Sequence, residues 1–286
     1  IKASKENRGG IIHCNISNKE LNNIVNVDYA VKGDCGVLIN KIIDLIEINK
    51  REDWLSIIHK WKKQYKFESI RCNNNNINSQ DVIIELNKQT PNKEDYIFTS
   101  GVGNHQMFAA QFIDWRHPRS FISSGSLGVM GFGLPSAIGV SIAKPDKTVI
   151  DIDGDGSFLM TMSDMKTAKQ YDLTNLKVLV LNNNTLGMVD IWEKIFYSNR
   201  KTATDNSYCP SFAEVARPFG FKTLICDNKK DLQTTINTFL NTYGPILCEC
   251  VVEHTPCFPL VPPGNALDNI ITNEDNITIN NNSAPS

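Results

Sequence analysis

The sequence has no excess of charge of either sign, and this absence excludes several classes of protein. Its 29 lysine and arginine residues are nearly balanced by 31 aspartate and glutamate residues. No basic stripe indicates a nucleic-acid partner, and no acidic tail indicates a solvating role. An anionic ligand must therefore be held by local backbone and side-chain geometry.

Long apolar runs and paired cysteines are also missing. No stretch approaches the roughly 20 apolar residues that span a bilayer, and no signal peptide is recognisable, so the sequence predicts no membrane partner. The 8 cysteines form no CxxC pair, which predicts reduced structural thiols, not a disulfide framework. Cys248 and Cys250 alternate within an apolar stretch and are expected to share one face of a strand as small core residues.

What the chain does contain is a regular alternation of apolar strands and amphipathic helices, in a composition that is 41% hydrophobic. Strands are expected at 96–100, 120–124, 148–152, 177–181, 222–225 and 246–252. Helices are expected at 80–87, 105–113, 134–143, 158–170, 211–218 and 230–243. This order predicts an α/β fold with a mainly parallel sheet and helices on both faces.

The ends of the chain follow other patterns. Residues 1–48 predict a short βαβα fragment, too small to be a domain alone, and residues 49–85 predict an amphipathic helix and an asparagine-rich linker. The tail at 272–286 is rich in Asn and Ser and is predicted to be disordered. Because the chain opens at Ile1 on what reads as a loop, we expect that an amino-terminal portion is missing.

A ligand-binding turn is predicted where the strand at 148–152 runs into the segment DGDGS at 153–157 and then into a helix. The two glycines permit a tight turn and a close approach of the backbone to a ligand. The free N–H groups of residues 156–158 would attract an anion at the helix start. The Asp155 carboxylate would repel a phosphate, and a divalent cation between the two groups removes that conflict.

A second source of oxygen ligands follows the next strand. Twenty-five residues separate Gly156 from Asn182 and Asn183, which end the strand at 177–181. Consecutive parallel strands bring their ends to the same edge of the sheet, so an asparagine amide oxygen can complete the octahedral shell of magnesium. Gly-Asp-Gly or Asn-Asn alone usually marks a plain turn. Their combination in this order predicts a magnesium and diphosphate site.

With this spacing the sequence resembles the thiamine diphosphate enzymes, whose signature is GDG, a gap of this size, and NN. The resemblance implies three magnesium ligands, namely Asp155, Asn183 and the backbone carbonyl of Thr185. It implies contacts with the diphosphate from the turn residues Gly154, Gly156 and Ser157. It also implies that Asn182 supports the turn and does not bind the metal.

Longer stretches resemble the catalytic subunit of the acetolactate (acetohydroxyacid) synthases. They are GVGNHQMFAAQ at 101–111, SSGSLGVMGFGLP at 123–135, VIDIDGDGSF at 149–158 and NNNTLGMV at 182–189, with Trp192. The resemblance implies that 86–271 is the domain that binds thiamine diphosphate and Mg²⁺. It implies that 1–48 is the end of a central FAD-binding domain. The expected flavin neighbours are Asn15, Ile16 and Asp34.

The resemblance adds cofactor contacts outside the turn. They are Val102, Gly103, Asn104, His105, Gly128, Met130 and Met188. The family usually has glutamine before this histidine, and Asn104 is shorter by one methylene. Met130 matches the family's bulky residue that bends the cofactor. Without the resemblance, Met130 would be read as core packing, and His105 has an alternative role as a helix-start residue.

A pocket for the second substrate is implied by four residues. They are Met188, Val189, Trp192 and Phe196. Their spacing alone favours a helix stripe packed on a core. In the family, the tryptophan that matches Trp192 favours 2-ketobutyrate over pyruvate. The neighbouring position, usually polar, is Ile191 here, so the substrate preference stays open.

The implied reaction is acetolactate synthesis, in which pyruvate is decarboxylated and the hydroxyethyl unit is joined to pyruvate or 2-ketobutyrate, for branched-chain amino-acid biosynthesis. No catalytic residue is expected in this chain, because the family's activating glutamate lies in an upstream domain of a partner subunit. A homodimer or homotetramer and a regulatory subunit are expected partners. The expected compartment is the mitochondrion or plastid in a eukaryote and the cytoplasm in a bacterium.

Two other interpretations remain. The first is another thiamine diphosphate enzyme, a 2-ketoacid decarboxylase or oxidase, which the reaction product would distinguish. The second is a catalytically silent assembly subunit. The pair of Asp155 and Asn183 argues against the silent subunit, because assembly alone gives no reason for it.

Overall fold

The computed structural model describes residues 10–64 and 75–272, with the exception of residues 263, 266 and 268. The chain forms two compact units, Ile1–Lys66 and Phe67–Ser286. The boundary predicted at residue 85 falls inside helix α4 (Ser79–Gln89), which packs on helices of the second unit. The division of the chain into domains otherwise stays a prediction, and nearly all of the tail predicted to be disordered lies outside the described residues.

The first unit keeps the predicted strands and the helix after them, but residues 18–25 form turns and bends where the βαβα pattern placed its first helix. Strands β1 (Ile12–Asn15) and β2 (Tyr29–Lys32) pair in parallel. Helix α2 (Cys35–Ile42) follows β2 and continues into a 3₁₀ turn. Helix α3 (Glu52–Gln64) ends the part of this unit that the structure describes.

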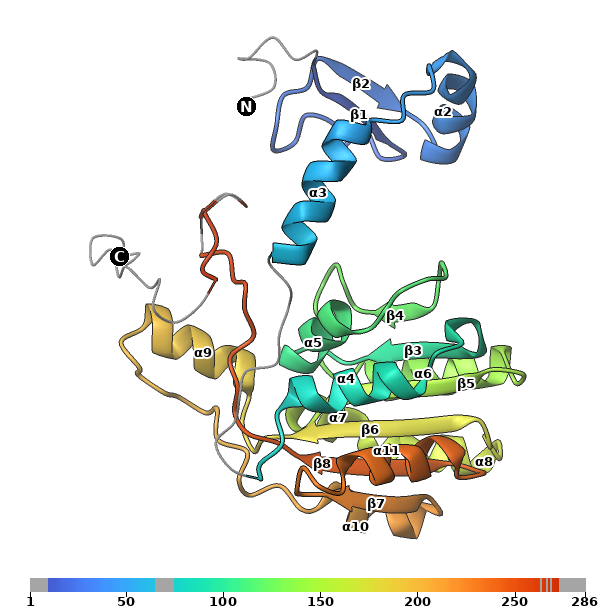
Figure 1. Cartoon of the computed structure of the whole chain (residues 1–286), viewed down its shortest axis with the longest axis vertical. Helices are drawn as coiled ribbons and strands as arrows, with labels where there is room; N and C mark the ends of the chain where they lie inside the picture. The colour runs from blue at the N-terminus through green and yellow to red at the C-terminus, as the bar shows by residue number, and fades with distance from the viewer. Residues whose placement is uncertain (1–9, 65–74, 263, 266, 268, 273–286) are drawn as a thin grey trace. The chain divides into compact units, whose positions relative to one another are not determined.

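The second unit is built on a six-stranded sheet with the order β4-β3-β5-β6-β8-β7, which Figure 1 shows edge to edge. Its strands are β3 (Tyr96–Ser100), β4 (Phe121–Ser123), β5 (Thr148–Gly154), β6 (Leu176–Asn182), β7 (Lys222–Cys226) and β8 (Ile246–Val251). Every pairing in this sheet is parallel. The predicted α/β fold is confirmed.

Helices cover both faces of this sheet. Helices α4, α5 (Asn104–Phe112) and α11 (Leu232–Asn241) contribute to one core. The other core takes residues from α6 (Gly133–Ala143), α7 (Asp155–Thr161), α8 (Met165–Gln170) and α10 (Phe212–Ala216). Helix α9 (Gly187–Phe196) packs in a smaller third cluster.

The prediction of a single helix at 158–170 is wrong. Helix α7 begins earlier, at Asp155, and ends at Thr161, and a 3₁₀ turn at Met162–Asp164 separates it from α8. The Thr161 hydroxyl donates a hydrogen bond of 2.9 Å to the Gly131 carbonyl. This contact ties the end of α7 to a loop distant in sequence, so local periodicity does not reveal the break.

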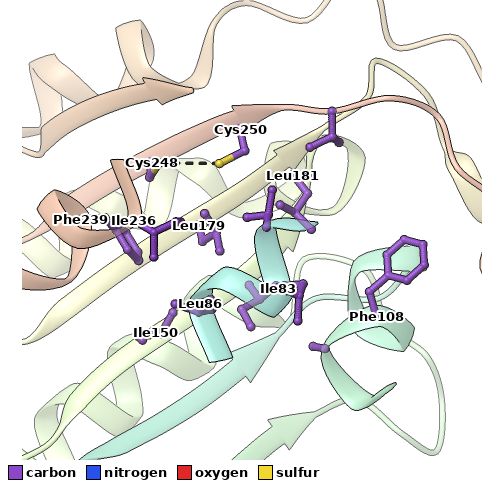
Figure 2. Packing of buried hydrophobic residues seen from close by; sticks show 14 of the residues in the cluster. Ile83, Leu86, Phe108, Ile150, Leu179, Leu181, Ile236, Phe239, Cys248 and Cys250 are labelled. Carbon is purple, nitrogen blue, oxygen red and sulfur yellow. Dashed lines mark hydrogen bonds between the residues drawn. The ribbon is translucent and has the colours of Figure 1, made fainter. Parts of the chain in front are cut away.

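The central strands are buried on both faces, as is typical of a parallel sheet. On β6, Leu179 and Leu181 face one core, and Val178 and Val180 face the other. Cys248 and Cys250 share one face of β8, as predicted, and their sulfur atoms lie 3.9 Å apart (Figure 2). The described cysteines are all free thiols. Among the described residues, no helix combines the length and apolar character needed to cross a membrane.

Candidate functional site

The carboxyl ends of β5 and β6 lie side by side, as the sheet argument predicted. Gly154 at the end of β5 pairs with Leu181 on β6. A cavity of about 210 Å³ opens at this edge. Its lining includes all of the residues predicted to contact the cofactor diphosphate, ring or metal, namely Val102, Gly103, Asn104, His105, Gly128, Met130, Gly154, Asp155, Gly156, Ser157, Asn183, Thr185 and Met188.

The turn after β5 presents backbone to the cavity. Helix α7 begins directly at Asp155, with Gly154 as its N-cap, and residues 155–157 are buried. A β-carbon at Gly154 would lie 2.6 Å from His105 Nδ1, and one at Gly156 would lie 2.3 Å from Leu186 Cδ2. The glycines therefore leave space that a side chain would fill, at the point where the helix N–H groups are free.

Asp155 is the charged group of this turn. Burial raises the pKa of its carboxyl to about 6, and a hydrogen bond of 3.3 Å donated by Asn206 Nδ2 partly opposes that rise. A buried carboxylate is costly unless a cation or donors compensate it. Oxygen donors beside a buried carboxylate are the ligands that Mg²⁺ prefers, so the residues present fit such an ion.

The loop after β6 supplies those oxygens. Asn182 Oδ1 accepts a hydrogen bond of 3.0 Å from the Asn184 N–H, and Asn183 Oδ1 accepts one of 3.2 Å from the Thr185 N–H. Asn184 has a φ of 56°, in the left-handed region that asparagine tolerates. Asn182 thus supports the turn, which the resemblance had implied. The Thr185 hydroxyl anchors the loop on the Thr204 carbonyl at 2.8 Å.

The opposite wall is the turn that opens α5. Gly103, with a φ of 154°, is the N-cap of this helix. Among the described residues, neither polar atom of the Asn104 side-chain amide finds a hydrogen-bond partner, although both atoms are buried. An orphaned amide in a cavity wall is costly unless a ligand or water pairs with it. Despite its shorter side chain, Asn104 is therefore suited to a polar ligand.

Two further carboxylates lie behind this wall on β5, and neither was predicted as a site residue. Asp153 Oδ1 is 3.3 Å from His105 Nε2, although this contact does not have the geometry of a hydrogen bond. Asp151 accepts a hydrogen bond of 2.8 Å from the Thr99 hydroxyl. Complete burial, and then the neighbouring Asp153, raise the pKa of Asp151 well above its ordinary value.

Only part of the implied second-substrate pocket lines the cavity. Met188 and Val189 do, whereas Trp192 and Phe196 pair with each other on α9 at 5.2 Å between ring centroids. The buried residues of α9 are Asp190, Ile191 and Ile195. The core stripe of this helix is therefore made by Ile191 and Ile195, and of the four predicted residues Phe196 packs against it.

The residues expected near a flavin lie in the first unit and have local roles there. Asn15 Oδ1 accepts a hydrogen bond of 2.9 Å from the Ser17 N–H, and Asp34 caps α2 by accepting one of 3.0 Å from the Val37 N–H. Ile16 is exposed. A role of these residues in flavin binding stays a prediction.

Several residues at the cavity were missed. Ser79, Leu181, Leu186 and Gly187 line it. Asn206 reaches Asp155 from an irregular segment that follows α9. No periodicity or motif marks that segment, and it arrives at the site through an antiparallel bridge between Thr185 and Asp205. Such a tertiary contact has no signal in a single sequence.

Several known proteins with sequences similar to this chain come from one enzyme family. Residues 101–250 match the C-terminal TPP-binding domain of the thiamine pyrophosphate enzymes. The chain is 42% identical over 280 residues to "Acetolactate synthase, mitochondrial" of Schizosaccharomyces pombe, which covers 95% of this chain and 41% of that protein. It is 40% identical over 274 residues to "Acetolactate synthase catalytic subunit, mitochondrial" of Saccharomyces cerevisiae. That match covers 94% of this chain and 40% of the yeast protein.

A plant protein gives a similar match. "Acetolactate synthase, chloroplastic" of Arabidopsis thaliana is 35% identical over 283 residues, which is 94% of this chain and 42% of the plant protein. The chain thus spans about two fifths of the length of the curated relatives it matches.

Proposed function

Because the chain belongs to the thiamine pyrophosphate enzymes and corresponds to the carboxy-terminal part of the acetolactate synthases, we propose that it holds the cofactor for acetolactate synthesis. The observation that carries the proposal is the meeting of Asp155 with Asn183 and Thr185 at the ends of two adjacent strands. In the proposed reaction, pyruvate is decarboxylated and its two-carbon unit is joined to pyruvate or 2-ketobutyrate.

The metal would be Mg²⁺. Asp155, the Asn183 amide oxygen and the Thr185 carbonyl would be its protein ligands, and diphosphate oxygens and water would complete the shell. The cation would neutralise Asp155 and the diphosphate at once, which explains why a carboxylate sits at a helix start that attracts anions. The backbone at Gly154, Gly156 and Ser157 would hold the diphosphate.

The remaining cavity residues would orient the cofactor ring. Thiamine diphosphate supplies, when bound, the electron sink for decarboxylation of a 2-ketoacid. Met130 lines the cavity beside Gly156, where its flexible side chain can support a ring. Val102 and Gly128 would leave room for that ring. Asn104 and His105 would donate hydrogen bonds from the opposite wall.

The second 2-ketoacid would approach along the start of α9. Met188 and Val189 line the cavity there. Trp192 and Phe196 lie one and two turns further along the same helix. Their rings would limit the size of the 2-ketoacid, and the apolar lining would exclude water from the reacting centre.

Chemistry would need groups that the cavity does not contain. Of the residues that line the cavity, none is a glutamate, and we propose that the activating glutamate comes from another domain in a dimer or tetramer. FAD would be held at the first unit, near Asn15, Ile16 and Asp34, together with parts of the protein upstream. A regulatory subunit would be a further partner.

The compartment we propose is an organelle. The two fungal relatives carry "mitochondrial" in their names and the plant relative carries "chloroplastic". Imaging of the full-length protein with a carboxy-terminal fluorescent tag tests this. Signal in the cytosol would contradict it.

Two experiments test the function. Calorimetric titration of the chain with thiamine diphosphate is expected to give heat only when Mg²⁺ is present. Absence of binding at every Mg²⁺ concentration, also after the upstream domains are restored, would favour an assembly subunit. Turnover of pyruvate by the full-length protein is expected to give acetolactate. Free acetaldehyde or acetate would instead identify a decarboxylase or an oxidase.

A further inference from the structure

A buried carboxylate stands behind the loop that follows β6. Glu249, at the centre of β8, is only 3% exposed. Its Oε1 accepts a hydrogen bond of 2.9 Å from Asn182 Nδ2. Its Oε2 accepts two more, of 2.8 Å from the Ser211 hydroxyl and of 3.0 Å from the Ala213 N–H. The two oxygens thus serve two different segments.

The hydrogen bond that Oε1 accepts, here called the Oε1 branch, connects Glu249 to the loop after β6. This loop holds Asn183 and Thr185 and is called the proposed metal loop. Because Asn182 Nδ2 is held by Glu249, its Oδ1 is aimed at the Asn184 N–H, 3.0 Å away. That hydrogen bond holds Asn184 in its left-handed conformation, between Asn183 and Thr185. The orientation of this amide group therefore helps to set the position of both proposed metal ligands, together with the anchor of Thr185 on Thr204.

The Oε2 branch leads to α10 instead. Ser211 is the N-cap of this helix, and its hydroxyl accepts a hydrogen bond from the Glu214 N–H. Ala213 is buried in the core on that face of the sheet. This branch fixes the helix to β8 and does not touch the loop after β6.

We propose that Glu249 is a positioning residue for the proposed metal loop, acting through Asn182. This inference rests on the proposed function for its meaning, although the contact itself is independent of any cofactor. The carboxylate is required because all three of its partners are donors. A glutamine would offer one acceptor oxygen and turn an NH₂ group toward at least one N–H or O–H donor, leaving buried donors unpaired.

The test compares three variants with the wild-type chain, without ligand, by hydrogen exchange of peptides that cover residues 180–187. Glu249→Ala and Asn182→Ala both break the Oε1 branch, and each is expected to speed exchange of this loop about tenfold. Ser211→Ala is the matched control, because it removes a donor from the same carboxylate on the Oε2 branch. It is expected to leave the loop within about twofold of wild type.

Binding provides the second readout. In the presence of thiamine diphosphate, Glu249→Ala and Asn182→Ala are expected to weaken Mg²⁺ binding about tenfold by calorimetry, and Ser211→Ala to leave it unchanged. The double variant Glu249→Ala/Asn182→Ala is expected to bind Mg²⁺ no more weakly than Asn182→Ala, because both changes break one link. Wild-type exchange of the loop in Glu249→Ala or in Asn182→Ala, or equal loosening of the loop by Ser211→Ala, would overturn the inference.

The two proposals fail separately. If the wild-type protein bound no cofactor, the proposed function would fall, while exchange in the ligand-free chain would still decide the role of Glu249. If Glu249→Ala did not fold, the comparison of Asn182→Ala with Ser211→Ala would decide whether the Oε1 branch holds the loop, because neither change removes the buried carboxylate.

Discussion

Asn206 donates a hydrogen bond of 3.3 Å from its side-chain amide to Oδ2 of Asp155. The two residues come from different parts of the fold, since Asp155 opens α7 and Asn206 lies between α9 and α10. The contact orients the carboxylate at the start of α7. The site is therefore a meeting of three segments, which follow β5, β6 and α9.

Burial of the Asp155 carboxylate costs free energy that a bound cation would offset. We expect Asp155→Asn to raise the free energy of unfolding of the metal-free chain by on the order of 1 kcal/mol, because a neutral amide removes the desolvation penalty of a buried carboxylate. The same change should abolish the stabilisation that Mg²⁺ and thiamine diphosphate give to the wild type. Urea denaturation with EDTA and with both ligands measures the two effects. A variant that kept the ligand-dependent shift would exclude Asp155 as a metal ligand.

Gly133 is expected to be intolerant of any side chain. A β-carbon there would lie 2.5 Å from Asp151 Oδ1 and 2.7 Å from the Gly101 backbone nitrogen. Because backbone cannot move aside, Gly133→Ala should destabilise the chain by about 2 kcal/mol or more. Gly139→Ala on the same helix is the matched control. It has no neighbour within 4 Å of a new β-carbon and should stabilise by about 0.5–1 kcal/mol. Equal effects of the two changes on the urea midpoint would contradict the packing described.

Asp190, within α9, contacts two residues that follow this helix in the sequence. This buried carboxylate contacts Lys201 and lies 3.3 Å from His254 Nε2. Asp190→Asn is expected to cost about 2–4 kcal/mol, because removing one partner leaves the others uncompensated. The exposed pair of Asp114 and Arg116 gives the control, since Arg116→Ala should cost less than about 1 kcal/mol. A loss for Asp190→Asn as small as for Arg116→Ala would show that the contact contributes little.

Lys177 should make stability depend on pH in the alkaline range. Burial, with a smaller contribution from Lys222, lowers the pKa of Lys177 from 10.5 to about 8. Between these two values the unfolded chain keeps a proton that the folded chain has lost, so the free energy of unfolding rises with pH. The stability of the wild type relative to Lys177→Met should therefore increase by on the order of 1 kcal/mol between pH 7 and pH 10.

The relative measure removes constant losses, such as the hydrogen bond of 2.8 Å that Lys177 donates to the Thr242 carbonyl. Lys144→Met, at an exposed position, should give a difference that does not change with pH. A flat difference for Lys177→Met as well would mean that Lys177 titrates as in the unfolded chain.

The sequence predicted the parts of the site that depend on local pattern and on one rule of topology. Apolar runs located β5 and β6, and the parallel crossover rule brought the residues after them to one edge. The place of β8 between β6 and β7 has no local signal, because strand order depends on packing of the whole sheet. The contact of Glu249 with Asn182 depends on that order, and the contact of Asn206 with Asp155 depends on the bridge between Thr185 and Asp205, so neither was predicted.

The position of β8 has a consequence for synthesis on the ribosome. This strand is the last of the sheet in sequence, yet it pairs with β6 on one side and β7 on the other. A nascent chain that has emerged as far as β7 has one long edge of β6 without a partner, and such an edge can pair with other chains. The loop after β6 obtains its Glu249 partner only when residues 246–251 emerge. The cofactor site is therefore completed late in translation, and until then protection of the β6 edge would fall to chaperones.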